Sequence, residues 1–223
     1  MRILLTGSKS FGAAVFNRLI SDGHDVDCVC CPVGDKKDKL SIAVSNSRTI
    51  KKVIKSGFLD SESCPEGIDL IVAAHSHDFV GKKTRDAARH GAIGYHPSLL
   101  PLHRGRDAVK WTAKMGDKVA GGTVYWLSET VDGGAIAAQR HVVTGGRLTA
   151  KELWGEHLFG IGVELISGVC ADIANGEAMA VPQDHSIATW EPSIGGQPLL
   201  YRPDLLMIGG DGLKRNVEGT VAR

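Results

Sequence analysis

The chain has 223 residues, of which 43% are hydrophobic and 23% are charged, and its formal net charge is +1. A chain of this length and composition is expected to fold as one globular domain, or as one domain with a short appendage, around a substantial core. The balanced charge provides no broad basic surface, so a function that depends on gripping a large polyanion such as nucleic acid is disfavoured.

The five cysteines indicate a reducing compartment. Their number is odd, and Cys28, Cys30 and Cys31 share one apolar run, where cysteine behaves as a small buried hydrophobe. That spacing does not resemble a zinc site, and we expect no metal. The chain reaches Gly7 too early for a signal peptide, and no apolar run approaches the ~20 residues that a membrane span needs. We therefore expect a cytoplasmic protein with no membrane segment.

The first elements predict a βαβ unit. Residues 2–6 form a short apolar run that stops at a glycine, residues 13–21 have the spacing of a helix, and residues 26–31 form a second buried strand. A strand, a helix and a strand within about thirty residues indicate a parallel sheet. Residues 40–53 are polar and mixed, and they predict no definite element.

The middle of the chain continues this alternation. Residues 69–74 form the cleanest buried strand, residues 82–90 a polar-faced helix, and residues 92–95 a strand that runs directly into His96. A histidine at the carboxyl end of a parallel strand points into the crevice where α/β sheets bind ligands. Pro97 and further prolines stiffen the path behind it. From this chemistry alone, a functional His96 and a satisfied buried histidine are equally supported.

The second half predicts an antiparallel pair and a long helix. Residues 107–115 are helical in pattern, and residues 122–127 and 135–143 form two strands joined by a turn. Thr149 and Glu152 have the spacing of a capping box, which opens a helix that continues to about residue 173. The last fifty residues are rich in proline and glycine, so we expect a loop-rich tail with short strands at most.

Three polar motifs each have a structural interpretation beside the functional one. The turn of residues 7–12 exposes N–H groups that could hold an anion, but it lacks the dinucleotide and P-loop glycine patterns, so a tight strand-to-helix turn is favoured. His75 and His77 have no third metal ligand at a sensible spacing, and they are interpreted as lining the crevice. Asp132 followed by two glycines is by itself a turn.

Taken together, these segments resemble the 10-formyltetrahydrofolate-dependent formyltransferase superfamily. The resemblance is carried by the stretch Tyr95-His96-Pro97-Ser98-Leu99-Leu100-Pro101 and by the Asp-Gly-Gly turn that starts at Asp132, 36 residues beyond His96. The chain is most similar to the hydrolase domain of 10-formyltetrahydrofolate dehydrogenase, which shares the following Trp-Thr and Gly-Asp-Lys motifs. The resemblance implies an α/β fold with a Rossmann-like parallel sheet, a catalytic domain over residues 1–180, and a loop-rich extension over residues 181–223.

The resemblance also implies the roles of particular residues. His96 and Asp132 match two members of the family's Asn-x-His plus Asp trio, whereas Gly94 stands where transferases have the asparagine. The hydrolase domain also lacks this asparagine, so water is implied as a formyl acceptor. The folate-binding positions implied by the resemblance are Ala74, His75, His77, Phe79, Ser98, Ser128 and Val131. Those implied to face the acceptor are Gly94, Tyr95 and Arg104.

Several alternatives stay open at this point. The formyl group of 10-formyltetrahydrofolate passes either to water, with release of tetrahydrofolate and formate, or to an amine of a small metabolite or amino sugar. Methionyl-tRNA is disfavoured as an acceptor because residues 181–223 are few and contain few basic side chains. The presence of both His96 and Asp132 argues against a non-catalytic folate-binding module. The first turn lacks the dinucleotide-binding glycine pattern, which argues against a nicotinamide-dependent oxidoreductase. The oligomeric state is open, with a homodimer among the options.

Overall fold

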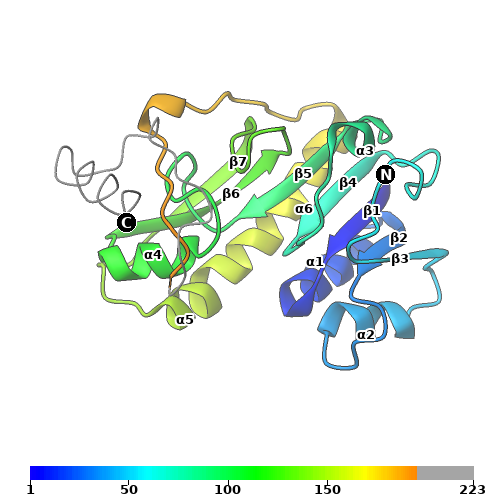
Figure 1. Cartoon of the computed structure of the whole chain (residues 1–223), viewed down its shortest axis with the longest axis horizontal. Helices are drawn as coiled ribbons and strands as arrows, with labels where there is room; N and C mark the ends of the chain where they lie inside the picture. Colours follow the sequence, from blue (N-terminus) through cyan, green and yellow to red (C-terminus); the bar gives the residue numbers. More distant parts are fainter. Residues whose placement is uncertain (195–223) are drawn as a thin grey trace, which may run out of the picture.

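The computed structural model describes residues 1–194. Seven strands form one sheet in the order β3-β2-β1-β4-β5-β6-β7 (Figure 1). They are β1 (Arg2–Gly7), β2 (Asp25–Cys31), β3 (Lys52–Lys55), β4 (Leu70–Ala74), β5 (Ala92–His96), β6 (Val119–Trp126) and β7 (Ile136–Val143). The first five strands pair in parallel, and β6 and β7 add antiparallel neighbours after β5. The predicted α/β class and the predicted antiparallel pair are confirmed.

The helices follow the predicted order with two additions. They are α1 (Lys9–Ser21), α2 (Lys39–Asn46), α3 (Lys82–Asp86), α4 (Ala108–Met115), α5 (Ala150–Glu152), the π-helical turn η1 (Leu153–Leu158), α6 (Phe159–Asn175) and the 3-10 turn η2 (His185–Ile187). Helix α2 and strand β3 occupy the segment for which the pattern predicted no element. The Asp38 side chain caps α2 by accepting from the Ser41 N–H. Helix α2 buries only Leu40 and Val44, and β3 is a largely exposed edge strand, so neither segment shows a clear apolar pattern.

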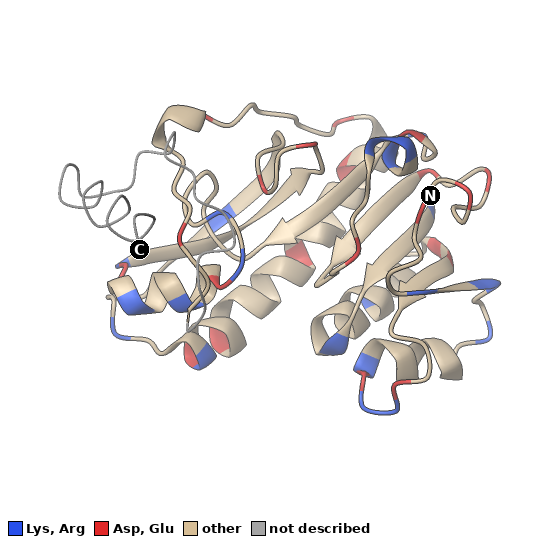
Figure 2. Cartoon of the chain, in the orientation of Figure 1, with Lys and Arg blue, Asp and Glu red and all other residues tan. Residues whose placement is uncertain are grey.

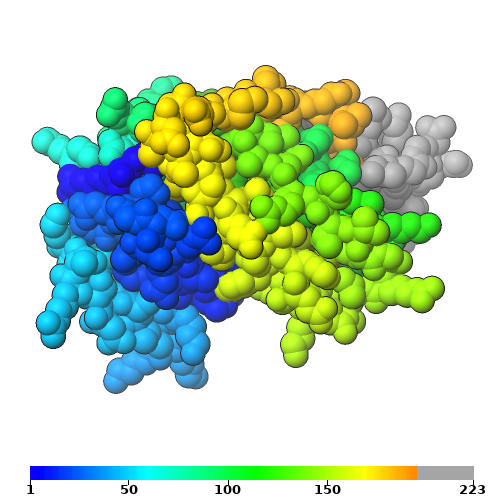
Figure 3. Space-filling view, turned by 180° about the vertical axis from the view of Figure 1, so that it is seen from behind, coloured from blue at the N-terminus to red at the C-terminus, as the bar shows by residue number. Residues whose placement is uncertain are grey.

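The two faces of the sheet are covered differently. Helices α1 and α6 pack on one face, where Phe16, Leu19 and Ile166 belong to the main core (Figure 3). On the other face, a second core cluster contains Cys28, Cys30 and other strand residues beneath the α3 region. All five cysteines are buried and free, which confirms the burial predicted for Cys28, Cys30 and Cys31. Burial raises the pKa of the Cys28 and Cys30 thiols to about 12, so they are unreactive.

The long helical run after β7 corrects one expectation. The predicted capping box is present at Thr149 and Glu152, and helical structure continues from Ala150 to Asn175, 26 residues in all. By length and composition alone this run could cross a membrane, so the expectation that no apolar run approaches the ~20 residues of a membrane span was wrong. Its apolar residues are explained by packing: Leu165, Ile166 and other side chains of α6 are buried against the sheet.

The chain returns across the sheet after α6. We call residues 181–194 the C-terminal strap; it runs from the end of α6 past the β6–β7 turn and down to α4 (Figure 1). Two isolated bridges fasten it, Val181 to Ile136 and Trp190 to Arg104. These bridges agree with the expectation of short strands at most, and the rest of the predicted tail, residues 195–223, lies outside the described residues. Figure 2, which colours the ribbon by residue type, shows basic and acidic positions interspersed along the helices, strands and loops.

Candidate active site

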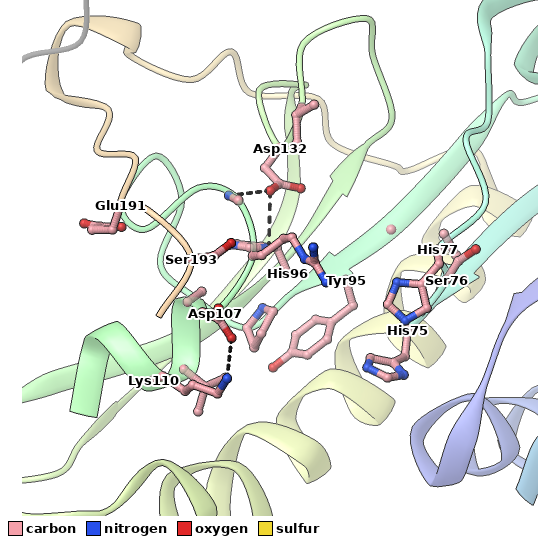
Figure 4. A pocket seen from close by; sticks show the side chains of 18 of the residues that line it. His75, Ser76, His77, Tyr95, His96, Asp107, Lys110, Asp132, Glu191 and Ser193 are labelled. Carbon is pink, nitrogen blue, oxygen red and sulfur yellow. Dashed lines mark hydrogen bonds and ion pairs between the residues drawn. The ribbon is translucent and has the colours of Figure 1, made fainter. Parts of the chain in front are cut away.

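A cavity of about 800 Å³ opens at the carboxyl ends of β1, β4 and β5. The chain moves from β1 to β2 on one side and from β4 to β5 on the other, so the cavity lies at the switch point where open α/β sheets bind ligands. His75 and His77 stand on one side of it, and Asp107, Lys110 and Ser193 on the other (Figure 4). The volume is within the range of small-molecule sites, roughly 300–1,000 Å³.

His96 ends β5 and is only 7% exposed. Its Nε2 lies 2.7 Å from the carbonyl oxygen of His103. Because a carbonyl only accepts, Nε2 must carry a proton and donate it, which leaves Nδ1 as the ring atom available for chemistry. Nδ1 lies 3.7 Å from Oδ2 of Asp132 (Figure 4). The structure therefore brings together the two residues that the sequence singled out.

Asp132 is fixed by two hydrogen bonds, one to each carboxylate oxygen. The Tyr125 hydroxyl donates to Oδ1 at 2.6 Å, and the Gly105 backbone N–H donates to Oδ2 at 2.7 Å. Burial and the Asp132 charge raise the pKa of Tyr125 well above its ordinary value, so the phenol remains a neutral donor. The carboxylate is thus oriented toward His96, where it can act as a proton acceptor or stabilise a neighbouring positive charge.

Left-handed backbone conformations of non-glycine residues gather at this cavity. Among the described residues they are Lys9, His75, His103, Asp107 and Asp132, with φ between 50° and 57°. Four of these residues line the cavity, and the fifth, His103, provides the carbonyl behind His96. Such conformations cost on the order of 1 kcal/mol or more each, and they tend to persist at functional sites. Their clustering supports the cavity as the active site independently of its volume.

In the glycine turn after β1, the N–H of the first helical residue, Lys9, is not available to an outside anion. The backbone N–H of Lys9 donates to Oδ2 of Asp38 at 2.6 Å. Gly7 permits the close approach of β1 and β4, since a Cβ there would stand 2.2 Å from the Ala74 carbonyl oxygen. These contacts agree with the favoured interpretation as a tight strand-to-helix turn. At the next strand end, burial and the Lys9 ammonium lower the pKa of His75, which favours its neutral ring.

Gly94 faces the cavity from β5, opposite Tyr125 in the antiparallel register. A Cβ at this position would stand 3.0 Å from Leu127 Cδ2 and 3.6 Å from Tyr125 Cε1. The space that a longer side chain would need is therefore partly filled by these two neighbours. Because position 94 is a glycine, it provides no carboxamide donor. Tyr125, which pairs with Gly94 on the neighbouring strand, donates its hydroxyl hydrogen bond to Asp132.

The other predicted site residues divide into two groups. His75, His77, Gly94, Tyr95 and Val131 line the cavity together with His96 and Asp132. The Tyr95 ring packs against Phe11 and its hydroxyl donates to the Leu158 carbonyl at 2.7 Å, so the hydroxyl is engaged within the protein.

The second group does not line the cavity; it consists of Ala74, Phe79, Ser98, Ser128 and Arg104. Ala74 is fully buried in the sheet, and the 2% exposed Ser98 donates to the Leu102 carbonyl. Arg104 is buried and donates to the Gln183 side chain. Phe79 is exposed and Ser128 is half-buried, and both lie outside the lining. The predicted folate-binding or acceptor-facing roles of these five residues stay predictions, and their side chains lie outside the cavity lining.

Sequence reasoning missed several residues that the structure places at the cavity. Tyr125 could have been found from strand register, because it pairs with Gly94 and faces the same side. The strap residues Trp190, Glu191 and Ser193 carried no signal, since nothing in their local pattern connects them to residues almost a hundred positions earlier. Among the described residues, no group of three or more His, Cys, Asp or Glu side chains is arranged to hold a metal ion.

A buried charged cluster lies directly behind His96. His103 is 5% exposed, with Nε2 2.8 Å from Asp117 Oδ2 and Nδ1 3.0 Å from Glu191 Oε1. Burial alone would lower the pKa of His103, but the two carboxylates raise it above its ordinary value. The two contacts of the His103 ring connect Glu191 of the strap to the loop that follows His96.

Replacing Glu191 with glutamine is expected to flatten the loss of stability at rising pH. The folded pKa of His103 lies above its unfolded value of about 6.5, so its stabilisation is complete below that pH and is lost as pH rises through the folded pKa. Glu191→Gln removes one carboxylate that raises this pKa. Thermal unfolding of both proteins from about pH 6 to about pH 9 measures the difference. Parallel curves for the two proteins would contradict the expectation.

Comparison with known proteins finds one family. A family model described as formyl transferase matches residues 1–155. The mitochondrial 10-formyltetrahydrofolate dehydrogenase of Mus musculus is 33% identical over 201 residues, and the match covers 86% of this chain but 22% of that relative. This chain therefore spans less than a quarter of the length of the dehydrogenase that it matches.

Solved structures with the same fold carry related descriptions. A 4-N formyltransferase from Francisella tularensis has a TM-score of 0.69 at 18% identity, over 85% of this chain and 75% of that one. Glycinamide ribonucleotide transformylase 1 from Symbiobacterium toebii has a TM-score of 0.65 at 20% identity, over 81% of this chain and 94% of that one. At these identities the likeness shows the shared fold.

Proposed function

This chain belongs to the formyl transferase family, and we propose that it removes the formyl group from 10-formyltetrahydrofolate and passes it to water. The products would be tetrahydrofolate and formate. The observation that carries this proposal is the pair of the buried His96 and the half-buried Asp132, whose Nδ1 and Oδ2 atoms lie 3.7 Å apart in a cavity large enough for a small-molecule substrate. We also propose a cytoplasmic location, which the five free cysteines support.

The chemistry begins with attack on the formyl carbon. A water oxygen bonds to this carbon and passes a proton to Asp132, while the carbonyl electron pair moves to the formyl oxygen. His96, with Nε2 held by the His103 carbonyl, directs Nδ1 at this oxyanion and in its protonated form donates to it. The intermediate then restores the C=O bond and breaks the bond to N10, which takes up the proton that Asp132 accepted from water, so that tetrahydrofolate and formic acid leave and Asp132 is again a carboxylate.

Two features support water as the acceptor. Gly94 leaves the cavity without a carboxamide beside His96, so no side chain there would orient an incoming amine. Leu127 and Tyr125 narrow the space at the same point. The alternative is transfer to an amine of a small metabolite or amino sugar, which the described function of the Francisella tularensis structure favours. With either acceptor, the second small molecule that the protein binds would be the folate that carries the formyl group.

Incubation with 10-formyltetrahydrofolate alone, followed by the absorbance of tetrahydrofolate, tests the proposal. We expect steady turnover with no amine added and one formate released per tetrahydrofolate. Turnover that starts only when an amine is supplied would replace hydrolysis with transfer. Folate binding without turnover under either condition would leave a binding module and overturn the enzyme assignment.

A further inference from the structure

The geometry points to Gln183, in the C-terminal strap, as a positioning residue that fixes Asp132 against His96. This inference rests on the proposed formyl chemistry, because it assigns Gln183 a role in that same site. Gln183 lies outside residues 1–155, which the family model matches, and it does not line the cavity. Its effect on the reaction must therefore pass through the residues that it holds.

Gln183 uses both ends of its amide. Its Nε2 donates to the backbone carbonyls of Asp132 at 2.9 Å and Gly134 at 2.7 Å. Its Oε1 accepts from Arg104, with Nη2 at 2.6 Å and Nε at 3.2 Å. Because the guanidinium only donates and the carbonyls only accept, the orientation of the amide is determined by its partners. The side chain is 6% exposed, so water does not easily replace these bonds.

These bonds join the two loops that supply the reacting pair. Asp132 belongs to the β6–β7 turn, whereas Arg104 belongs to the loop that follows His96 and is adjacent to Gly105, which donates to Asp132 Oδ2. Gln183 therefore connects the loops behind the site, and the Gly105 N–H connects them within it. The Asp132 backbone is left-handed with φ 50°, and the Gln183 bond to its carbonyl helps to hold this costly conformation.

The same strap also supports His96. The buried Thr189 hydroxyl accepts from the His103 N–H at 2.7 Å, and the Thr189 carbonyl accepts from the Arg104 N–H at 3.0 Å. The His103 carbonyl is the group that accepts from His96 Nε2. The strap thus contacts the backbone behind each member of the pair: Gln183 behind Asp132 and Thr189 behind His96. Gln183 is the sharper test, because its side chain reaches Asp132 directly.

The replacement Gln183→Glu keeps the size and the Arg104 partner but removes both donors. A carboxylate oxygen would then face two backbone carbonyls, so the Asp132 turn should move away. A misplacement of about 1 Å can cost on the order of 100-fold in rate. We expect kcat to fall about 10- to 100-fold, with KM for 10-formyltetrahydrofolate changed by less than about threefold. Gln183→Met, which also lacks the donors, serves if the glutamate variant does not fold.

The matched control is Trp111→Phe. The Trp111 indole N–H donates to the Pro192 carbonyl at 2.7 Å, so this change removes a strap hydrogen bond that does not reach the reacting pair. We expect its kcat to remain that of the intact protein. A fall in kcat equal to that of Gln183→Glu would overturn the inference, because any loosening of the strap would then suffice.

A double-mutant cycle separates positioning from simple stability. If Gln183 acts through Asp132, then Gln183→Glu in an Asp132→Asn background should change kcat by less than about twofold. An undiminished loss in that background would overturn the inference while leaving formyl release by the intact protein in place. If the intact protein releases no formyl group, a crystal structure of Gln183→Glu still decides. The Nδ1–Oδ2 separation should exceed 3.7 Å, and an unchanged separation would overturn the inference.

Discussion

His96→Ala is expected to lower kcat for formyl release by about 1,000-fold while the protein remains folded. The change removes the ring nitrogen that lies at the cavity and faces Asp132. A charged or polarised donor at a developing oxyanion typically contributes about 100- to 1,000-fold, and the loss of proton transfer adds to this. The rest of the cavity would still bind the proposed substrate, so KM should change much less than kcat.

The protein should still fold after this change because of the position of the His96 side chain. The ring lies at the cavity wall, so its removal widens an existing space that water can enter, and water can then donate to the exposed His103 carbonyl. His141→Ala is the matched control, since His141 is an exposed histidine on β7 outside this cavity. Rates measured beside thermal midpoints separate chemistry from stability. Near-normal kcat in His96→Ala would exclude His96 from the reaction.

The backbone segments that form the site could be predicted from the sequence because each is defined by a short stretch of neighbouring residues. The strand before His96, its proline-stiffened exit and the turn at Asp132 are each visible within about ten residues. The resemblance then supplied the pairing of His96 with Asp132 across the sheet. It could not supply side-chain direction, which is why Ser98 and Arg104 were predicted at the site but face the protein interior.

What the pattern could not reveal depends on long-range contacts. Gln183 reaches back 51 residues to the Asp132 carbonyl, and the Thr189 hydroxyl accepts across 86 residues from His103. No periodicity marks such residues, because they lie in a proline-rich segment without regular structure. The left-handed conformations were equally hidden: Lys9, His75 and Asp132 are not glycines, and only tertiary contacts hold them there.

These hidden contacts change how the site should be understood. The Asp132 turn contains two glycines and would be adaptable by itself. Tyr125, Gly105 and Gln183 restrain it from three separate segments, β6, the loop after His96 and the strap. A carboxylate held from several directions needs little reorganisation when charge develops beside it, which is the property that lowers a reaction barrier.

Asp132→Asn should have an effect close to that of His96→Ala, about 100- to 1,000-fold on kcat. Asparagine has nearly the same shape, and its carbonyl oxygen can still accept from the Gly105 N–H, while its NH₂ group can face Tyr125, whose hydroxyl oxygen is able to accept. What is lost is the negative charge beside His96 Nδ1 and the ability to take a proton from the attacking water.

The fold should therefore be kept while the chemistry is lost. Asp86→Asn is the matched control, because it removes a carboxylate from an exposed pair with Lys82 and should leave kcat unchanged. The two variants are compared by tetrahydrofolate release and by thermal unfolding on the same preparations. If Asp132→Asn keeps kcat within about threefold of the intact protein, the carboxylate is not the base and the reaction must draw its proton acceptor from elsewhere in the cavity. If it unfolds instead, the two donors to Asp132 stabilise the turn more than they serve the reaction.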